Sequence, residues 1–127
     1  MSIAYVCVAI AGLMPCLWVG YAKFAGRGYD NQAPREFLAA LSGARQRAHW
    51  AQLNAFEAFP LFAAAVIIAQ ISGVEPSRVD ALAIAFVLLR LAYGISYIGN
   101  RPTLRSLLWS LALLSVIALF VLTAQHQ

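Results

Sequence analysis

Apolar residues fall into four long stretches along the chain, and these stretches contain almost no charged residues. They cover residues 1–22, 48–74, 81–100 and 106–127. A hydrocarbon core of about 30 Å requires about 20 helical residues, so each stretch is long enough to cross it once. Because backbone polar groups must be satisfied within lipid, each stretch is predicted to form a transmembrane helix.

The composition agrees with a membrane protein. Hydrophobic residues make up 62% of the chain and charged residues 11%, whereas soluble domains carry about 25% charged residues. The net charge is +4. The chain has no compact run of Lys and Arg with interleaved aromatic residues, so nucleic acid is not an expected partner. No metal site is indicated. The sequence predicts an all-α fold, an integral membrane four-helix bundle, as a single domain over residues 1–127.

The connections between the stretches differ in character. The first, residues 23–47, is long and basic. Its segment 33–43 is weakly amphipathic and is expected to form either a short interfacial helix or a loop. The second is a tight turn, after which Ser77 is expected to cap the third helix and Asp80 to lie in its first turn. In the third connection, Pro102 suits the start of the last helix.

The distribution of basic residues predicts the orientation in the membrane. Seven Lys and Arg residues lie in the first and third connections, whereas the second contains only Arg78. The positive-inside rule therefore predicts cytoplasmic first and third connections, with both termini on the far side. No basic region precedes the first stretch, so it is expected to be a retained span and not a signal peptide. The expected location is the bacterial inner membrane.

Two ionisable residues interrupt the apolar stretches. Glu57 is the only Asp, Glu, Lys or Arg in residues 48–74, and Arg90 is the only one in residues 81–100. A charge near the bilayer centre costs roughly 2.5–3.5 kcal/mol on insertion scales, and such residues usually pair or mark a functional site. Their distances from the intervening turn predict depths that differ by about 4–5 Å. We expect the two side chains to meet, either as a structural ion pair or as part of a binding site.

Further polar residues share helix faces with this pair. One face, with spacings of three and four, carries Arg47, Trp50, Asn54, Glu57 and Leu61, and the other carries Arg90, Tyr93, Tyr97 and Arg101. Residues at these spacings are neighbours on a helix surface. The two faces predict a polar strip that opens to the cytoplasm. It would suit a small ligand with several carboxylates, held by arginines, and an ammonium group, held by Glu57.

The chain resembles the MAPEG family, the membrane-associated proteins in eicosanoid and glutathione metabolism. Asn54-x-x-Glu57, followed by Pro60, resembles the signature of the family's second helix, and residues 90–106 are similar to the junction of its third and fourth helices. The resemblance covers nearly the whole chain. Eukaryotic members usually carry an arginine one turn before the Asn or directly before it, and here these positions hold Trp50 and Leu53. The aromatic residue that often follows the Glu is replaced by Ala58.

The resemblance implies a homotrimer with glutathione, as co-substrate, bound between subunits near the cytoplasmic face. It implies contacts to glutathione from Asn54, Glu57, Arg90, Tyr93, Tyr97, Arg101 and Ser106. Arg105 matches the arginine that stabilises the glutathione thiolate, which is the nucleophile. The third connection is one residue shorter than in a eukaryotic member, which leaves Arg101 as the alternative for this role.

The favoured function is that of a membrane-embedded glutathione-dependent transferase or peroxidase acting on lipophilic electrophiles. Expected partners are further copies of the chain, membrane lipids and lipophilic small molecules. Two alternatives remain open. One is a non-catalytic protein of the same fold that binds lipid or glutathione, and the other is a small four-helix transporter that uses Glu57 for coupling.

Overall fold

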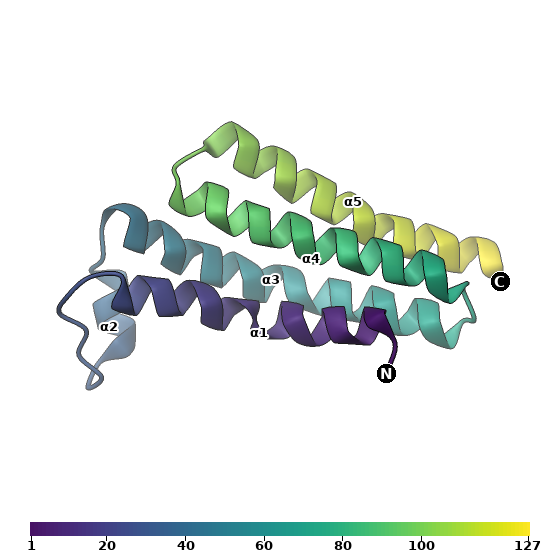
Figure 1. Ribbon diagram of the computed structural model, residues 1–127, viewed down its shortest axis with the longest axis horizontal. Coiled ribbons are helices and arrows are strands. Elements are labelled where there is room, and N and C mark those ends of the chain that lie inside the picture. The colour runs from purple at the N-terminus through teal and green to yellow at the C-terminus, as the bar shows by residue number, and fades with distance from the viewer.

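Each apolar stretch forms one long helix in the computed structural model, which describes residues 1–127 (Figure 1). The helices are α1 (Ile3–Phe24), α2 (Pro34–Ala39), α3 (Gly43–Ile71), α4 (Pro76–Ile98) and α5 (Pro102–His126). Helices α1, α3, α4 and α5 are long and apolar enough to cross a membrane. The predicted all-α bundle of four spans is therefore confirmed.

The helices extend beyond the apolar stretches at the ends that carry charge. α3 begins at Gly43, before Arg45 and Arg47, and α4 begins at Pro76, before Arg78. Hydrogen bonding within a helix does not stop where the hydrocarbon stops, so charged turns can continue the helix into the headgroup region. The weakly amphipathic segment of the first connection contains a helix, α2, which spans six residues.

The bundle is built from two helix pairs. α1 packs mainly on α3 and α5 packs mainly on α4, and α3 and α4 form the centre (Figure 1). The rings of Phe62 and Phe86 stack across this centre with centroids 3.8 Å apart. Alanines line the buried side of α1 and α3, at positions 4, 11, 51, 55 and 65. Small residues let helix backbones approach closely in membranes, where packing drives association.

A close contact between α1 and α4 depends on a glycine. A Cβ atom added at Gly94 would lie 2.1 Å from Cζ2 of Trp18. Both residues are buried. The absence of a side chain at Gly94 therefore makes the space that the Trp18 indole occupies.

Two arginines cap helix ends at the basic end of the bundle. Arg45 donates hydrogen bonds to the carbonyl oxygens of Ala22 at 2.9 Å and Lys23 at 2.8 Å, in the last turn of α1. Arg47 donates from Nε at 3.1 Å and from Nη2 at 3.0 Å to the carbonyl oxygen of Ile98, the last residue of α4. Helix C-termini leave carbonyls without intrahelical partners, and these arginines satisfy them.

The opposite end differs from the sequence-based expectation. Ser77 does not cap α4, because the helix begins at Pro76 with Glu75 as its N-cap residue. Proline is favoured at the first helical position, and this places Ser77 inside the helix. The expectation that Asp80 lies in the first turn of α4 is also wrong, since that turn contains no acidic residue. Asp80 instead adds to the capping of α1 by Ser2, because its Oδ1 accepts a hydrogen bond from the backbone N–H of Ala4 at 2.8 Å.

Candidate functional site

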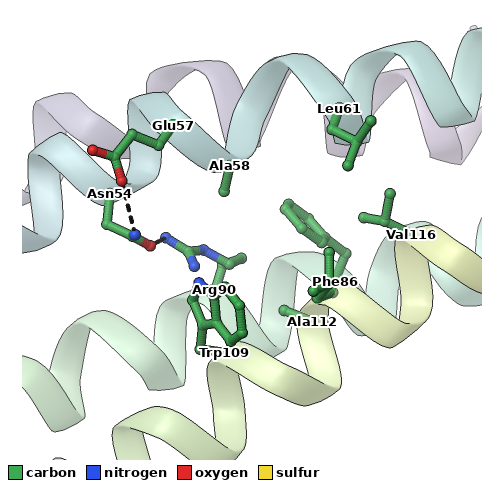
Figure 2. Close-up of a pocket in the computed structure, with 10 residues that line it drawn as sticks. Asn54, Glu57, Ala58, Leu61, Phe86, Arg90, Trp109, Ala112 and Val116 are labelled. Carbon is green, nitrogen blue, oxygen red and sulfur yellow. Dashed lines mark hydrogen bonds between the residues drawn. The ribbon is translucent and has the colours of Figure 1, made fainter.

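Arg90 and Glu57 are joined through Asn54. Nη2 of Arg90 donates a hydrogen bond to Oδ1 of Asn54 at 2.7 Å, and Nδ2 of Asn54 donates to Oε2 of Glu57 at 3.1 Å (Figure 2). Of the two alternatives raised by the sequence, the direct ion pair between Glu57 and Arg90 is not formed; the one salt bridge in the chain joins Arg78 and Glu75. Matched depth does not fix the rotation of a helix about its axis. The half-buried Asn54 faces α4, whereas Glu57 lies on the exposed side of α3.

Aromatic rings continue this network toward the basic end. The Arg90 guanidinium, in a side chain only 3% exposed, lies over the ring of Tyr93 at 4.2 Å from the centroid. The rings of Tyr93 and Tyr97 meet edge to face at 5.7 Å. Arg105, from α5, lies over the ring of Tyr97 at 4.4 Å. Arginine above an aromatic ring is a favourable cation–π arrangement.

These contacts form one continuous set of side chains. We name it the polar strip, and it consists of Glu57, Asn54, Arg90, Tyr93, Tyr97 and Arg105. It brings together six of the eight residues for which the sequence suggested a role in the site. The other two lie outside it and are exposed: Arg101 is the N-cap residue of α5, and Ser106 lies near the start of that helix.

The turn between α4 and α5 sets the direction of Arg105. Asn100 has a positive φ of 56°, a conformation that Asn tolerates better than most residues. The backbone N–H of Arg101 donates to the carbonyl oxygen of Ser96 at 2.9 Å, and that of Asn100 donates to Tyr97 at 3.1 Å. This is a Schellman motif, a regular helix ending. It turns the chain so that α5 runs back along α4 with Arg105 over Tyr97.

An apolar groove lies next to the polar strip, between α3, α4 and α5. Its cavity volume is about 220 Å³. It shares Asn54, Glu57 and Arg90 with the strip, and its remaining lining is formed by Ala58, Leu61, Phe86, Trp109, Ala112, Leu113 and Val116. Figure 2 shows the three polar residues toward one end, and Leu61, Phe86 and Val116 toward the other. The groove is therefore apolar along most of its length and polar at one end.

The groove residues on α5 were not singled out from the sequence, although a signal was present. Arg105, Trp109, Ala112 and Val116 follow one another at spacings of four, three and four. This pattern places them on one helix face. The last stretch is apolar on all sides, so its groove-lining face could not be told apart from its lipid-facing side by hydrophobicity.

A second hollow reaches the polar strip from another side. It has a volume of about 390 Å³ and is lined by Trp50, Leu53, Asn54, Glu57, Tyr93 and Tyr97. Asn54 and Glu57 line both this hollow and the apolar groove. Trp50 lies near Tyr97, with ring centroids 6.2 Å apart. Polar ligand groups could thus reach Glu57 from one side and an apolar molecule could reach it from the other.

The arrangement is suited to an anionic or zwitterionic ligand. Arg90 uses one N–H on Asn54 and keeps others, and arginine holds carboxylates through paired hydrogen bonds. No group of three or more His, Cys, Asp and Glu side chains that could hold a metal ion is assembled. The chemistry of the site rests on cationic and carboxylate side chains.

Comparison with known proteins identifies the family. Searches of curated proteins and of solved structures give no match. The model of the MAPEG family matches residues 3–125, which include all four spans and every residue of the polar strip. This multi-pass integral membrane protein belongs to the MAPEG family.

Proposed function

We propose that this protein is a glutathione-dependent transferase or peroxidase that acts on lipophilic electrophiles within the membrane. One observation carries the proposal: the polar strip shares Asn54, Glu57 and Arg90 with an apolar groove between membrane-spanning helices. A water-soluble thiol and a lipid-soluble substrate could be bound side by side there. Holding two reactants in contact lowers the entropic part of the barrier to their reaction.

The groups of glutathione match those of the strip. Glutathione carries an ammonium group, two carboxylates and a thiol. The exposed Glu57 carboxylate suits the ammonium group, and Arg90 suits a carboxylate. Arg105 lies near the start of α5, where the positive end of the helix dipole adds to its own charge. A cation beside a thiol favours the thiolate, which is the reactive form.

Two reactions are compatible with this arrangement. In conjugation, the thiolate sulfur bonds to an electrophilic carbon while the bond from that carbon to the leaving group, or to an epoxide oxygen, breaks. A leaving group such as a halide departs as its anion, whereas the epoxide oxygen stays attached as an alkoxide and takes a proton to become an alcohol. In reduction, the thiolate attacks the terminal oxygen of a lipid hydroperoxide and the O–O bond breaks. The alkoxide becomes an alcohol, and the sulfenic acid formed on glutathione condenses with a second glutathione to give a disulfide and water.

A homotrimer is part of the proposal. Glu57, Leu61 and Trp109 are exposed in the single chain, so one side of the site has no cover from the chain itself. A neighbouring copy that packed there would enclose glutathione between subunits. Native mass spectrometry in mild detergent should show a trimer, and a stable monomer would contradict a shared site.

A titration of the purified protein with glutathione tests the chemistry. An increase in thiolate absorbance in the ultraviolet is expected, together with saturable binding. Arg105→Gln should lose the thiolate signal while glutathione still binds weakly, and Arg101→Gln, which removes the same charge from the same end of α5, should keep more of it. The reverse ranking would assign the thiolate to Arg101.

A non-catalytic binding protein is the second candidate. Trp50 and Leu53 favour it, since both are exposed apolar side chains beside Asn54, whereas eukaryotic relatives usually carry an arginine at one or the other of these two positions. Fewer cations around the bound thiol would favour the thiolate less. In the same titration, saturable glutathione binding without a thiolate signal would support this candidate over the enzyme.

A further inference from the structure

Trp109 brings a hydrogen-bond donor into the apolar groove. It lines the groove on α5, opposite Asn54 and Glu57 of α3, and its side chain is 44% exposed. We propose that its indole N–H donates a hydrogen bond to an oxygen atom of the apolar substrate, so that the site prefers hydroperoxides and epoxides to alkyl halides. This inference rests on the proposed function, because it names the substrate class and a further residue of the same site.

The indole N–H of Trp109 is not used within the chain. Side-chain hydrogen bonds from α5 are donated by Ser110, Ser115 and Thr123, and none is donated by Trp109. An indole nitrogen can donate but not accept. In an apolar span an unpaired donor costs free energy, because lipid chains offer no acceptor. The donor is therefore left for an acceptor on another molecule.

The indole nitrogen is directed into the groove. Figure 2 shows the Trp109 ring beside Arg90, with its nitrogen on the side of the guanidinium. A tryptophan that only anchors a helix at the membrane interface would direct this nitrogen to the headgroups. Arg90 is only 3% exposed, so this end of the groove is shielded from water. A hydrogen bond formed there is electrostatically stronger than one formed in water.

The other polar groups of the groove have partners or proposed ligands. Asn54 accepts a hydrogen bond from Arg90 and donates one to Glu57. In the proposed function, Glu57 holds the ammonium group of glutathione and Arg90 holds a carboxylate. The rest of the lining is apolar and has no hydrogen-bonding side chain apart from Trp109. Trp109 therefore offers the donor that remains for an oxygen of the second substrate.

The position of Trp109 along α5 suits this role. Trp109 follows Arg105 by four residues, which places it on the same helix face and about 6 Å further along the helix axis. Arg105 is the proposed partner of the thiolate. A sulfur held at Arg105 and an oxygen held at Trp109 would lie at neighbouring levels, with the atom under attack between them.

The hydrogen bond would act on the oxygen that gains charge. When the thiolate attacks a hydroperoxide, the S–O bond forms, the O–O bond breaks, and its electron pair moves to the oxygen that stays on the lipid. When it attacks an epoxide, the S–C bond forms and the electron pair of the broken C–O bond moves to the ring oxygen. The indole donates to either alkoxide and keeps its own proton, and water supplies the proton of the alcohol. A donor aimed at developing charge lowers the barrier.

Turnover of two substrates tests the proposal. Trp109→Phe keeps an aromatic ring and removes the N–H, and an unchanged glutathione titration would show that the thiol site is intact. The kcat for cumene hydroperoxide should fall about tenfold or more, with a smaller change in KM, because the hydrogen bond strengthens as charge develops. Conjugation of hexyl iodide should change by less than about twofold, because iodide is a large anion that accepts hydrogen bonds weakly. An equal loss with both substrates, or unchanged hydroperoxide turnover, would overturn the proposal.

A binding experiment without turnover separates this proposal from the proposed function. In protein with isotope-labelled tryptophan, cumyl alcohol should shift the Nε1–H proton resonance of Trp109 downfield. Its analogue tert-butylbenzene, which carries a methyl group in place of the hydroxyl, should not. The loss of the resonance in Trp109→Phe identifies it. Equal shifts with both ligands would contradict an oxygen site. A shift specific to the alcohol, in a protein without thiolate signal or turnover, would support the oxygen site and reject the glutathione chemistry alone.

Discussion

The Arg90 guanidinium is bound to the side-chain amide of Asn54, at 2.7 Å, in place of the carboxylate of Glu57. The amide serves both partners, because it accepts from Arg90 and donates to Glu57. This leaves Glu57 on the exposed side of α3, where its carboxylate can receive a ligand. A direct ion pair would have consumed the same carboxylate. Asn54 thus satisfies a buried cation and keeps an anion available.

The first prediction concerns this amide. Asn54→Leu should destabilise the protein by about 1–3 kcal/mol, because a buried charged donor loses its partner. Asn54→Asp keeps an acceptor for Arg90 and should cost less. Unfolding by a denaturing detergent measures both changes. Equal stability of Asn54→Leu and the wild type would mean that Arg90 finds another acceptor without cost.

The same amide should carry the coupling between Glu57 and Arg90. A double-mutant cycle with Glu57→Gln and Arg90→Leu should be non-additive by more than about 0.5 kcal/mol in the wild-type background. In the Asn54→Leu background the two changes should become additive. Non-additivity of the same size in both backgrounds would instead indicate that the two charges interact directly.

Tyr97 is predicted to position Arg105. Tyr97→Leu removes the ring below the guanidinium, which lies 4.4 Å from the centroid. The lost interaction is worth about 1 kcal/mol, so glutathione affinity or the thiolate signal should fall about fivefold. Tyr97→Phe keeps the ring and is the matched control, with little loss. An equal loss in both variants would assign the effect to the Tyr97 hydroxyl group.

The contact between α1 and α4 gives a prediction about stability. Gly94→Ala should destabilise the protein by about 1–3 kcal/mol through overpacking against Trp18. Gly20→Ala is the control, because a Cβ there meets nothing within 4 Å. Thermal unfolding in detergent compares the two. A combined Trp18→Leu and Gly94→Ala variant should recover part of the loss, and a fully additive result would show that the clash lies elsewhere.

Arg47 is predicted to hold the turn that carries Arg105. Arg47→Met removes two hydrogen bonds to Ile98, so the α4–α5 turn should open more often. Hydrogen exchange of the amides in residues 99–105 should become faster, while the core of α4 should exchange as before. Arg27→Met, with the same loss of charge, should leave exchange in this turn unchanged. Unchanged exchange in Arg47→Met would mean that the turn needs no support from α3.

The orientation in the membrane is tested by chemical labelling. In a background with Cys7 and Cys16 replaced by Ala, Gln127→Cys should react with an impermeant maleimide from the periplasmic side of bacterial cells. Asn31→Cys, in the basic first connection, should react only after lysis. The opposite pattern would invert the topology and place the basic end outside the cytoplasm.

The spans and most of the polar strip could be predicted from sequence because both depend on patterns within one helix. Glu57 and Arg90 stood out as isolated charges, and spacings of three and four linked Arg90 to Tyr93 and Tyr97. The rotation of α3 relative to α4 is a tertiary property. This rotation decides that Asn54, and not Glu57, contacts Arg90. Residue spacing within one helix does not predict how that helix is rotated relative to its neighbour. The roles of Arg45 and Arg47 were hidden for the same reason, since their partners are backbone carbonyls of distant helices.

The hydrogen bond from Ala4 to Asp80 has a consequence for biogenesis. α1 is synthesised before the other three spans, and Ser2 caps its Tyr5 N–H locally, but the acceptor of its Ala4 N–H lies 76 residues later in the chain. While α1 enters the membrane, the N–H of Ala4 must rely on water or headgroups, because α4 has not yet been synthesised. α1 can already pack on α3 once the second span is inserted, but the Ala4 N–H gains its partner only when the third span arrives. A chain truncated before Asp80 would therefore keep the main packing of α1 and lose this hydrogen bond at its first turn.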